Sequence, residues 1–240
     1  MPSRLHRRQC PARALPVSTV LAFDCAVSGQ GVAIVRNGVS LASLFEEGRD
    51  QAARLLPAIA GALDLTGVAR TALDLIAVTT GPGSFTGVRV GLSAARGLAV
   101  GLGIPLAGIP TTSVLRAQAT ATDRLAVAAV DTRLGDWFAT IGDDPVPFAA
   151  TAGDLAARLG GQKCLIVGKD VAPLAASLQA VGIDAIVQEG PPDPVVLGRL
   201  ALGDGVEVWR ARNRTEGLPR PLYLRGVNIT LPDGARRTVE

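Results

Sequence analysis

Two patterns of apolar and polar positions alternate along the chain, and together they predict an α/β protein. Short apolar runs rich in Val, Ile and Ala predict buried strands, and longer stretches with apolar residues three and four apart predict helices. The first half reads as three strands, a helix, a strand, a helix, a short strand and a helix. We expect strands at 17–24, 30–36, 39–46, 75–80 and 105–109, and helices at 50–65, 88–102 and 111–120.

The second half repeats this order in reduced form. Strands are expected at 125–131, 136–141, 164–167 and 184–188, and helices at 155–159, 171–181 and 194–202. Thr151 and Asp154 have the spacing of a capping box, which predicts the start of a helix. A duplicated βββαβα unit is the ribonuclease-H-like arrangement of actin-type ATPases and sugar kinases, and this α/β arrangement is the predicted fold class. The repeat is visible in the order of elements, not in the residues.

Charge separates a basic extension from a nearly neutral body. The expected segments are a disordered extension at 1–16, an N-terminal subdomain at 17–110, a C-terminal subdomain at 111–225 and a tail at 226–240. The whole chain has 24 basic and 21 acidic residues, and four of the basic ones are arginines in the extension. The rest therefore has a net charge of −1, which argues against a nucleic-acid-binding surface on the body alone. The extension lacks the apolar centre of a secretory signal. The sequence contains no run of 18 apolar residues, so we expect no membrane span.

The most distinctive chemistry lies in the turn after the predicted strand at 75–80. Its residues are Gly81, Pro82, Gly83, Ser84, Phe85, Thr86 and Gly87. Three glycines and a proline predict a tight turn, and Ser84 and Thr86 are both placed to cap the next helix. A Walker loop would need a lysine here, and a serine hydrolase would need a histidine base, whereas the single histidine is His6 in the extension. We interpret the turn as a rigid corner at an interaction surface, with an anion site at the helix N-terminus as the alternative.

The three cysteines do not form a metal or redox motif. Cys10, Cys25 and Cys164 are widely spaced, and no two of them form a CxxC pair. Cys25 and Cys164 stand at the ends of apolar runs, so we expect two buried thiols in a reducing, cytoplasmic setting.

Several stretches, in order along the chain, resemble signatures of the TsaB family of bacterial tRNA threonylcarbamoyladenosine biosynthesis. They are Leu21–Asp24, Arg54–Pro57, Gly81–Gly91 and Pro221–Arg225, with a weaker match at Ala129–Arg133. The matches extend from about residue 18 to residue 225, so they cover nearly the whole chain. The resemblance implies the actin-type fold, also called ASKHA, that the order of elements predicts.

The resemblance also implies a non-catalytic role. The catalytic relative with the same fold, TsaD, has an HxxxH pair, which is a good metal-ligand spacing on a helix. The equivalent region here, 111–115, contains no histidine, cysteine or acid. We therefore expect no catalytic residue and no metal ligand in this chain.

We expect the chain to bind no cofactor of its own. In this fold, aspartates at the ends of two strands precede loops that hold nucleotide phosphates, which makes Asp24, Asp131 and Thr132 the candidates. Cys25 and Ala26 follow Asp24 where the family usually has hydroxyls, so two hydrogen-bond donors are missing. Whether a nucleotide binds at an interface with a partner stays open.

The resemblance implies that the first two helices pair with TsaD. The residues predicted at this partner interface are Arg54, Leu55, Pro57, Gly87, Val90, Gly91, Ala94, Ala95 and Leu98. Small residues three and four apart let another helix approach closely, although packing on the protein's own sheet explains part of the stripe. Gln51 replaces a histidine of the family near this surface. Substituting Ala95 by Glu is expected to abolish pairing.

The implied partners are a TsaD-like catalytic subunit and a TsaE-like ATPase, with tRNA contacted only through the complex and no membrane involved. A homodimer through the same helices is an alternative resting form. Two other classes of function stay open at this point. One is an independent actin-like ATPase or small-molecule kinase, and the other is a glycoprotease-like metalloenzyme.

Overall fold

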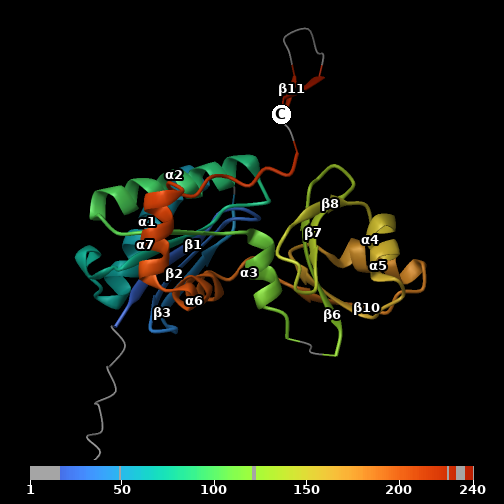
Figure 1. The fold of residues 1–240 in the computed structure, drawn as a ribbon, viewed down its shortest axis with the longest axis horizontal. Helices are drawn as coiled ribbons and strands as arrows, with labels where there is room; N and C mark the ends of the chain where they lie inside the picture. Colours follow the sequence, from blue (N-terminus) through green and yellow to red (C-terminus); the bar gives the residue numbers. More distant parts are fainter. Residues whose placement is uncertain (1–16, 49, 121–122, 226, 231–235, 240) are drawn as a thin grey trace, which may run out of the picture.

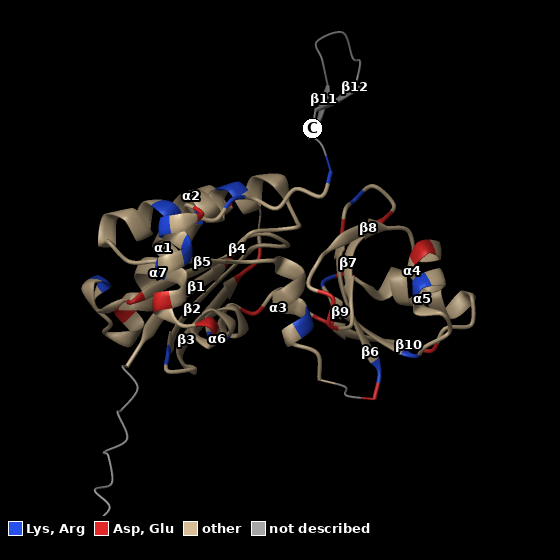
Figure 2. Cartoon of the chain, viewed as in Figure 1, with Lys and Arg blue, Asp and Glu red and all other residues tan. Residues whose placement is uncertain are grey.

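The computed structural model describes residues 17–225 apart from 49 and 121–122, and the backbone of the strands at 227–230 and 236–239. The predicted extension at 1–16 lies outside the described residues. Two α/β halves lie side by side, with acidic and basic residues interspersed over both of them (Figures 1 and 2). Among the described helices, none is both long and apolar enough to cross a membrane.

The first half is built on a five-stranded sheet in the order β3-β2-β1-β4-β5. The strands are β1 (Thr19–Asp24), β2 (Gln30–Arg36), β3 (Val39–Glu46), β4 (Leu75–Thr79) and β5 (Leu106–Ile109). The first three pair antiparallel, whereas β4 and β5 run parallel to β1. All six residues of β1 are buried, because this central strand is covered on both faces. The carboxyl ends of β1, β4 and β5 therefore lie at one edge.

The second half repeats this topology with its own five strands. These are β6 (Leu125–Asp131), β7 (Trp137–Ile141), β8 (Phe148–Ala150), β9 (Cys164–Gly168) and β10 (Ala185–Glu189). Their order, β10-β9-β6-β7-β8, matches the first sheet strand for strand, with β6 in the place of β1. This confirms the predicted duplicated ribonuclease-H-like fold.

One face of each sheet is covered by helices from its own half. They are α1 (Gln51–Thr66) and α2 (Phe85–Leu102) on the first sheet, and α4 (Ala152–Leu159) and α5 (Ala172–Ala180) on the second. Leu55, Ile59 and Leu92 are among the residues that α1 and α2 bury against the first sheet. Gly67 and Gly103 end the first two helices in the left-handed conformation, which glycine adopts without strain.

The opposite faces are covered by exchange between the halves. Helix α3 (Thr111–Ala117) follows β5 of the first half but packs on β6 and β7 of the second sheet, where Leu115 joins Ala128 and Val130. Helix α6 (Pro194–Asp204) follows β10 of the second half but packs on β1 and β2 of the first sheet. Figure 1 shows α3 between the two sheets and α6 beneath the first. The predicted subdomain at 111–225 therefore includes a helix that belongs by contact to the first sheet.

The structure differs from the predicted elements mainly at helix starts and in short elements. Helix α2 begins at Phe85 rather than at residue 88, because Ser84 caps it, and α4 begins at Ala152, because the Thr151–Asp154 capping box forms. Strand β8, helix α7 (Val206–Thr215) and the short 3₁₀ turn Arg70–Ala72 were not predicted. The predicted tail contains two paired strands, β11 (Val227–Thr230) and β12 (Arg236–Val239). The second half is thus reduced in the length of its elements, not in their order.

Candidate functional site

The glycine-rich turn packs directly against the backbone that follows β1. A Cβ at Gly83 would lie 2.2 Å from the carbonyl oxygen of Ala26, and one at Gly87 would lie 1.9 Å from that of Cys25. The backbone N–H of Ser84 donates to the carbonyl of Ala26 at 2.6 Å, and the Ser84 hydroxyl accepts from the N–H of Gly87 at 3.3 Å. The glycines are therefore required by close contact between two turns, and Ser84 is the residue that caps α2.

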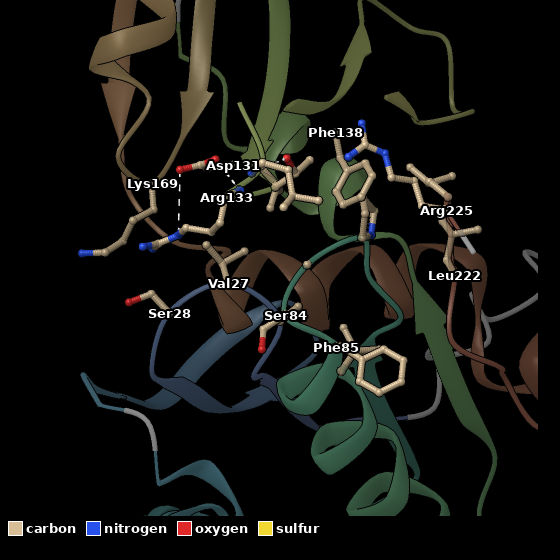
Figure 3. A pocket seen from close by; sticks show the side chains of 18 of the residues that line it. Val27, Ser28, Ser84, Phe85, Asp131, Arg133, Phe138, Lys169, Leu222 and Arg225 are labelled. Atoms are coloured by element: carbon tan, nitrogen blue, oxygen red, sulfur yellow. Dashed lines mark hydrogen bonds and ion pairs between the residues drawn. The ribbon is translucent and has the colours of Figure 1, made fainter. Parts of the chain in front are cut away.

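A cavity of about 690 Å³ lies where the turns of both halves meet. Its walls come from the turn after β1, the glycine-rich turn, the β6–β7 turn, the β9–α5 turn and the segment near the C-terminus (Figure 3). The residues that line it include Val27, Ser28, Ser84, Phe85, Asp131, Thr132, Arg133, Phe138, Lys169, Leu222, Tyr223 and Arg225. Its size suits a small molecule, and apolar side chains dominate its lining.

Backbone donors in the turn after β1 and in the β6–β7 turn are already engaged by side chains of this chain. Asp24 Oδ1 accepts from the N–H of Ala26 at 3.1 Å. In the equivalent turn of the second half, Asp131 Oδ1 accepts from the N–H of Arg133 at 2.7 Å, and Thr132 Oγ1 accepts from Leu134 at 3.1 Å. Two of the three cofactor candidates, Asp131 and Thr132, line the cavity, whereas Asp24 lies behind its wall.

The start of α5 is likewise capped from within the chain. The Glu189 carboxylate accepts from the N–H groups of Asp170, Val171 and Ala172 at 2.8, 3.1 and 3.1 Å. These N–H groups are among the donors with which a helix N-terminus holds an anion. Glu189 occupies that position and was not singled out by sequence reasoning, because 17 to 19 residues separate it from the groups it caps.

Asp24 is a buried carboxyl with one hydrogen-bonded and one unpartnered oxygen. The Thr79 hydroxyl donates to Oδ1 at 2.5 Å, and Oδ2 has no partner among the described residues. Burial raises the pKa of Asp24 to about 6, against the hydrogen bonds from Thr79 and the backbone, which lower it. The side chain is thus a structural support at the end of β1, and it keeps its proton to a higher pH than an exposed aspartate does.

The predicted buried thiols are confirmed for the two described cysteines. Cys25 and Cys164 are both free and buried, and burial raises the pKa of each thiol. Neither is poised as a nucleophile, because a reactive cysteine needs a lowered pKa. Cys10 lies outside the described residues. Within those residues, no three His, Cys, Asp or Glu side chains gather in a way that could hold a metal ion.

A cluster of two aromatic rings and an arginine sits at the mouth of the cavity. The Phe85 and Tyr223 rings stack with centroids 5.5 Å apart, and the Arg89 guanidinium lies 3.7 Å from the Phe85 centroid. Arg89 Nε donates to the Tyr223 hydroxyl at 2.8 Å. The sequence holds no local signal for this cluster, because Tyr223 lies 134 residues after Arg89.

Several matches among known proteins are named for the synthesis of threonylcarbamoyladenosine in tRNA. A family model described as "TsaD: tRNA N6-adenosine threonylcarbamoyltransferase" matches residues 46–156. The Escherichia coli protein named tRNA threonylcarbamoyladenosine biosynthesis protein TsaB is 34% identical over 119 residues, which is 49% of this chain and 52% of that protein. Its Haemophilus influenzae namesake is 37% identical over 123 residues, 49% of this chain and 51% of that protein. The chain thus spans about half the length of the curated relatives it matches.

Solved structures extend the similarity over most of the fold. The structure described as YeaZ from Pseudomonas aeruginosa is 26% identical and aligns with a TM-score of 0.65, over 86% of this chain and all of that one. A second structure from the same organism, described as similar to peptidase YEAZ, aligns with a TM-score of 0.67 over 87% of this chain and all of that one. Together these similarities support the TsaB family as the family that the chain resembles.

The stretches that resemble TsaB signatures converge in space. Leu21–Asp24 forms β1, Arg54–Pro57 lies in α1, and Gly81–Gly91 contains the turn and the start of α2. Ala129–Arg133 ends β6, and Pro221–Arg225 lies near the C-terminus. Three of these stretches border the cavity, and Asp24 at the end of β1 accepts a hydrogen bond from Ala26 in the cavity wall.

The residues predicted at the TsaB partner interface divide into two environments. Arg54 and Pro57 are exposed, and Val90, Ala94 and Leu98 are half-buried. Leu55, Gly87, Gly91 and Ala95 are buried in the core of the first half, so the prediction that these four face a partner is wrong. A Cβ at Gly91 would lie 3.4 Å from a methyl of Val78, which shows that small residues bring α2 close to its own sheet. The interface stays a prediction on the other five residues.

Proposed function

We propose that this chain is a non-catalytic subunit in the synthesis of N6-threonylcarbamoyladenosine in tRNA. In this proposal it pairs with a TsaD-like catalytic subunit, stabilises it and helps to form the surface on which a TsaE-like ATPase docks. Similarity to the TsaB family supports the pathway, because the curated relatives are named for threonylcarbamoyladenosine biosynthesis. The complex would act in the cytoplasm, and tRNA would be contacted only through it.

The observation that carries the pairing proposal is the uncharged outer face of α2. The helix contains two charged residues, Arg89 and Arg96, and both are turned to the segment near the C-terminus. Elsewhere α2 exposes Gly97 and Gly101 and half-exposes Val90, Ala94 and Leu98. Small residues in this pattern allow the backbone of a second helix to approach closely.

Helix α1 extends this face with apolar residues of its own. Leu56 is 55% exposed, and Pro57 and Gly61 are exposed beside it. Helices α1 and α2 contact each other, so their outer residues form one continuous surface. Arg54 lies at its edge and pairs with Glu46 at 3.2 Å. Apolar exposure of this extent on two packed helices favours a protein partner over solvent.

The engaged turns around the cavity support the non-catalytic part of the proposal. A phosphate group in the cavity would have to compete with Asp24, Asp131 and Glu189 for the backbone N–H groups they accept from. Such acceptors also repel an anion. We propose accordingly that the chain has no cofactor of its own, that any nucleotide lies at the interface with the partner, and that the partner supplies metal and chemistry.

A matched pair of glycine substitutions tests the pairing. Gly97→Glu on α2 and Gly203→Glu on α6 both place a carboxylate at an exposed helical glycine with no other residue within 4 Å of the new Cβ. We expect Gly97→Glu to abolish co-purification of the TsaD-like subunit encoded in the same genome, and Gly203→Glu to leave it intact. Mass spectrometry of tRNA digests should show the modified adenosine lost with Gly97→Glu alone.

Two results would contradict the proposal. One is wild-type pairing by the Gly97→Glu variant, and the other is threonylcarbamoyl transfer to tRNA by the purified chain without a partner. Steady ATP turnover by the chain alone would favour the actin-like ATPase or kinase alternative. A stable dimer of this chain that Gly97→Glu disrupts would assign the same face to a second copy.

A further inference from the structure

The segment near the C-terminus, residues 218–225, is called the strap here because it lies across the first half. Arg96 donates from Nε to the carbonyl of Pro219 at 3.0 Å, and the N–H of Leu222 donates to the carbonyl of Thr80 at 2.8 Å. The Pro219 ring fills the space that a side chain at position 108 would occupy, because a Cβ at Gly108 would lie 2.4 Å from it. The strap is thus held to β4, β5 and α2 along its length.

The last residue of the strap reaches the second half. The Arg225 guanidinium forms an ion pair with the Asp136 carboxylate and lies 5.8 Å from the centroid of the Phe138 ring. Asp136 in turn is held by a hydrogen bond from the Thr132 hydroxyl, so the β6–β7 turn presents a fixed acceptor. Figure 3 shows Arg225 beside Phe138 at one side of the cavity.

A second ion pair joins the halves at another part of the same cavity. Lys169, which lines the cavity from the β9–α5 turn, pairs with Glu47 after β3 at 3.0 Å. The exchanged helices α3 and α6 also connect the halves and contact each other. Val27 of the first half also packs on the apolar cluster of the second sheet that contains Val130. The halves are therefore joined by packed helices, by this apolar contact and by two ion pairs at the cavity.

We propose that the strap is a latch that holds the two halves closed over the cavity. Its release at Arg225 lets the halves separate about α3 and α6 while the rest of the strap stays on the first half. The asymmetry of the contacts supports this order of events. Several hydrogen bonds and an aromatic stack hold the strap to the first half, whereas Arg225 alone makes the ion pair with the second.

The strength of the Arg225–Asp136 pair suits a latch that can open. The Arg225 side chain is 37% exposed and that of Asp136 is 13% exposed. Because Asp136 is mostly buried, salt weakens this pair less than it would an exposed pair, even though the screening length falls from about 8 Å at physiological ionic strength to about 3 Å at 1 M. The apolar contacts of α3 and α6 do not weaken in this way. Salt should therefore open the cavity in part, and removal of either charge should open it further, without unfolding either half.

The latch can be tested by measuring the distance between the halves in the isolated chain. Spin labels at Asp64→Cys on α1 and Ala157→Cys on α4 occupy exposed positions, while Cys25 and Cys164 are buried and Cys10 is replaced by serine. Pulsed electron–electron double resonance should give one narrow distribution of the distance between the two labels in the latched chain. Arg225→Gln should broaden it and add a longer-distance population, and 1 M salt should have the same effect to a smaller extent.

A matched control and a second variant keep the test decisive. Arg212→Gln removes a more exposed ion pair, which joins α7 to Asp204 at the end of α6, and should leave the distribution narrow. Asp136→Asn breaks the latch from the other side and should reproduce the Arg225→Gln result. Thermal unfolding checks that each variant is folded, and hydrogen exchange at Leu222 should stay slow in all of them.

Narrow, wild-type distributions in both latch variants would overturn the proposal. Rapid exchange of the Leu222 amide in Arg225→Gln would also contradict it, because the strap would then leave the first half as well. Every measurement uses the chain without a partner, so these outcomes do not depend on whether the chain pairs with a TsaD-like subunit.

Discussion

Arg89 in α2 donates a hydrogen bond to the hydroxyl of Tyr223 at 2.8 Å, and so joins two stretches that are 134 residues apart. The same guanidinium lies over the Phe85 ring, which stacks on Tyr223. Both stretches resemble TsaB signatures, and their meeting gives a physical reason for their residue types. The strap thus fixes the position of the Arg89 guanidinium at the start of α2, although the residue stays exposed.

The Arg89–Tyr223 contact should be measurable as a coupling energy. Tyr223→Phe removes the acceptor but keeps the ring stack, so it should lower the free energy of unfolding by about 0.5–1 kcal/mol. In a double-mutant cycle with Arg89→Ala, followed by urea unfolding, the two changes should be less than additive. Strict additivity would mean that the hydrogen bond contributes nothing in solution.

Gly87 should tolerate no side chain, in contrast to a neighbour on the same helix. In Gly87→Ala the new Cβ would overlap the carbonyl of Cys25, so we expect a loss of about 1–3 kcal/mol of unfolding free energy. Gly97→Ala is the control, because it is exposed with nothing within 4 Å, and it should gain up to about 1 kcal/mol from helix propensity. Equal effects of the two substitutions in urea unfolding would contradict this account of the turn.

Asp24 should make stability depend on pH in an unusual direction. Its pKa is raised to about 6 in the folded protein, so between about pH 4 and pH 6 the folded state keeps a proton that the unfolded chain releases. The free energy of unfolding should therefore fall as pH rises through this window, by about 3 kcal/mol in total. In Asp24→Asn this contribution should be absent. The prediction fails if wild type and Asp24→Asn change in parallel from pH 4 to pH 6.

Two adjacent alanines separate folding from pairing. Ala95 is fully buried, so Ala95→Glu should destabilise the fold itself by several kcal/mol, on the order expected for an unpaired buried charge. Ala94 is half-exposed, so Ala94→Glu should remain folded but lose the TsaD-like subunit in co-purification. Thermal unfolding and pull-down of both variants check this, and a well-folded Ala95→Glu chain would contradict the packing of α2.

The long apolar elements could be predicted from sequence, because their burial leaves a local pattern. The continuous run of β1 and the capping box at Thr151 are examples, and both form in the structure. Helix α7 was missed because it is polar overall and buries only one of its residues. Trp209 is buried there and donates from its ring N–H to the carbonyl of Ala201. Strand β8 was missed because three residues carry no period.

The candidate site was harder to predict, because its contacts are long-range. A stripe of small residues on α2 fits a partner helix and the protein's own sheet equally well. Only the packing in the structure shows which of the two surfaces these residues face. Gly91 and Ala95 turned out to face the sheet. Glu189 and Arg225 contact groups that are distant in sequence, so no local motif predicts either contact.

The exchange of α3 and α6 has a consequence for any attempt to divide the molecule. A cut after residue 110 would give one fragment whose sheet lacks α6 and another that carries α6 with nothing to cover. Each fragment would expose a broad apolar face and should aggregate when produced alone. When the two fragments are produced together, they should associate and restore the fold of the intact chain, because α6 can then cover the first sheet.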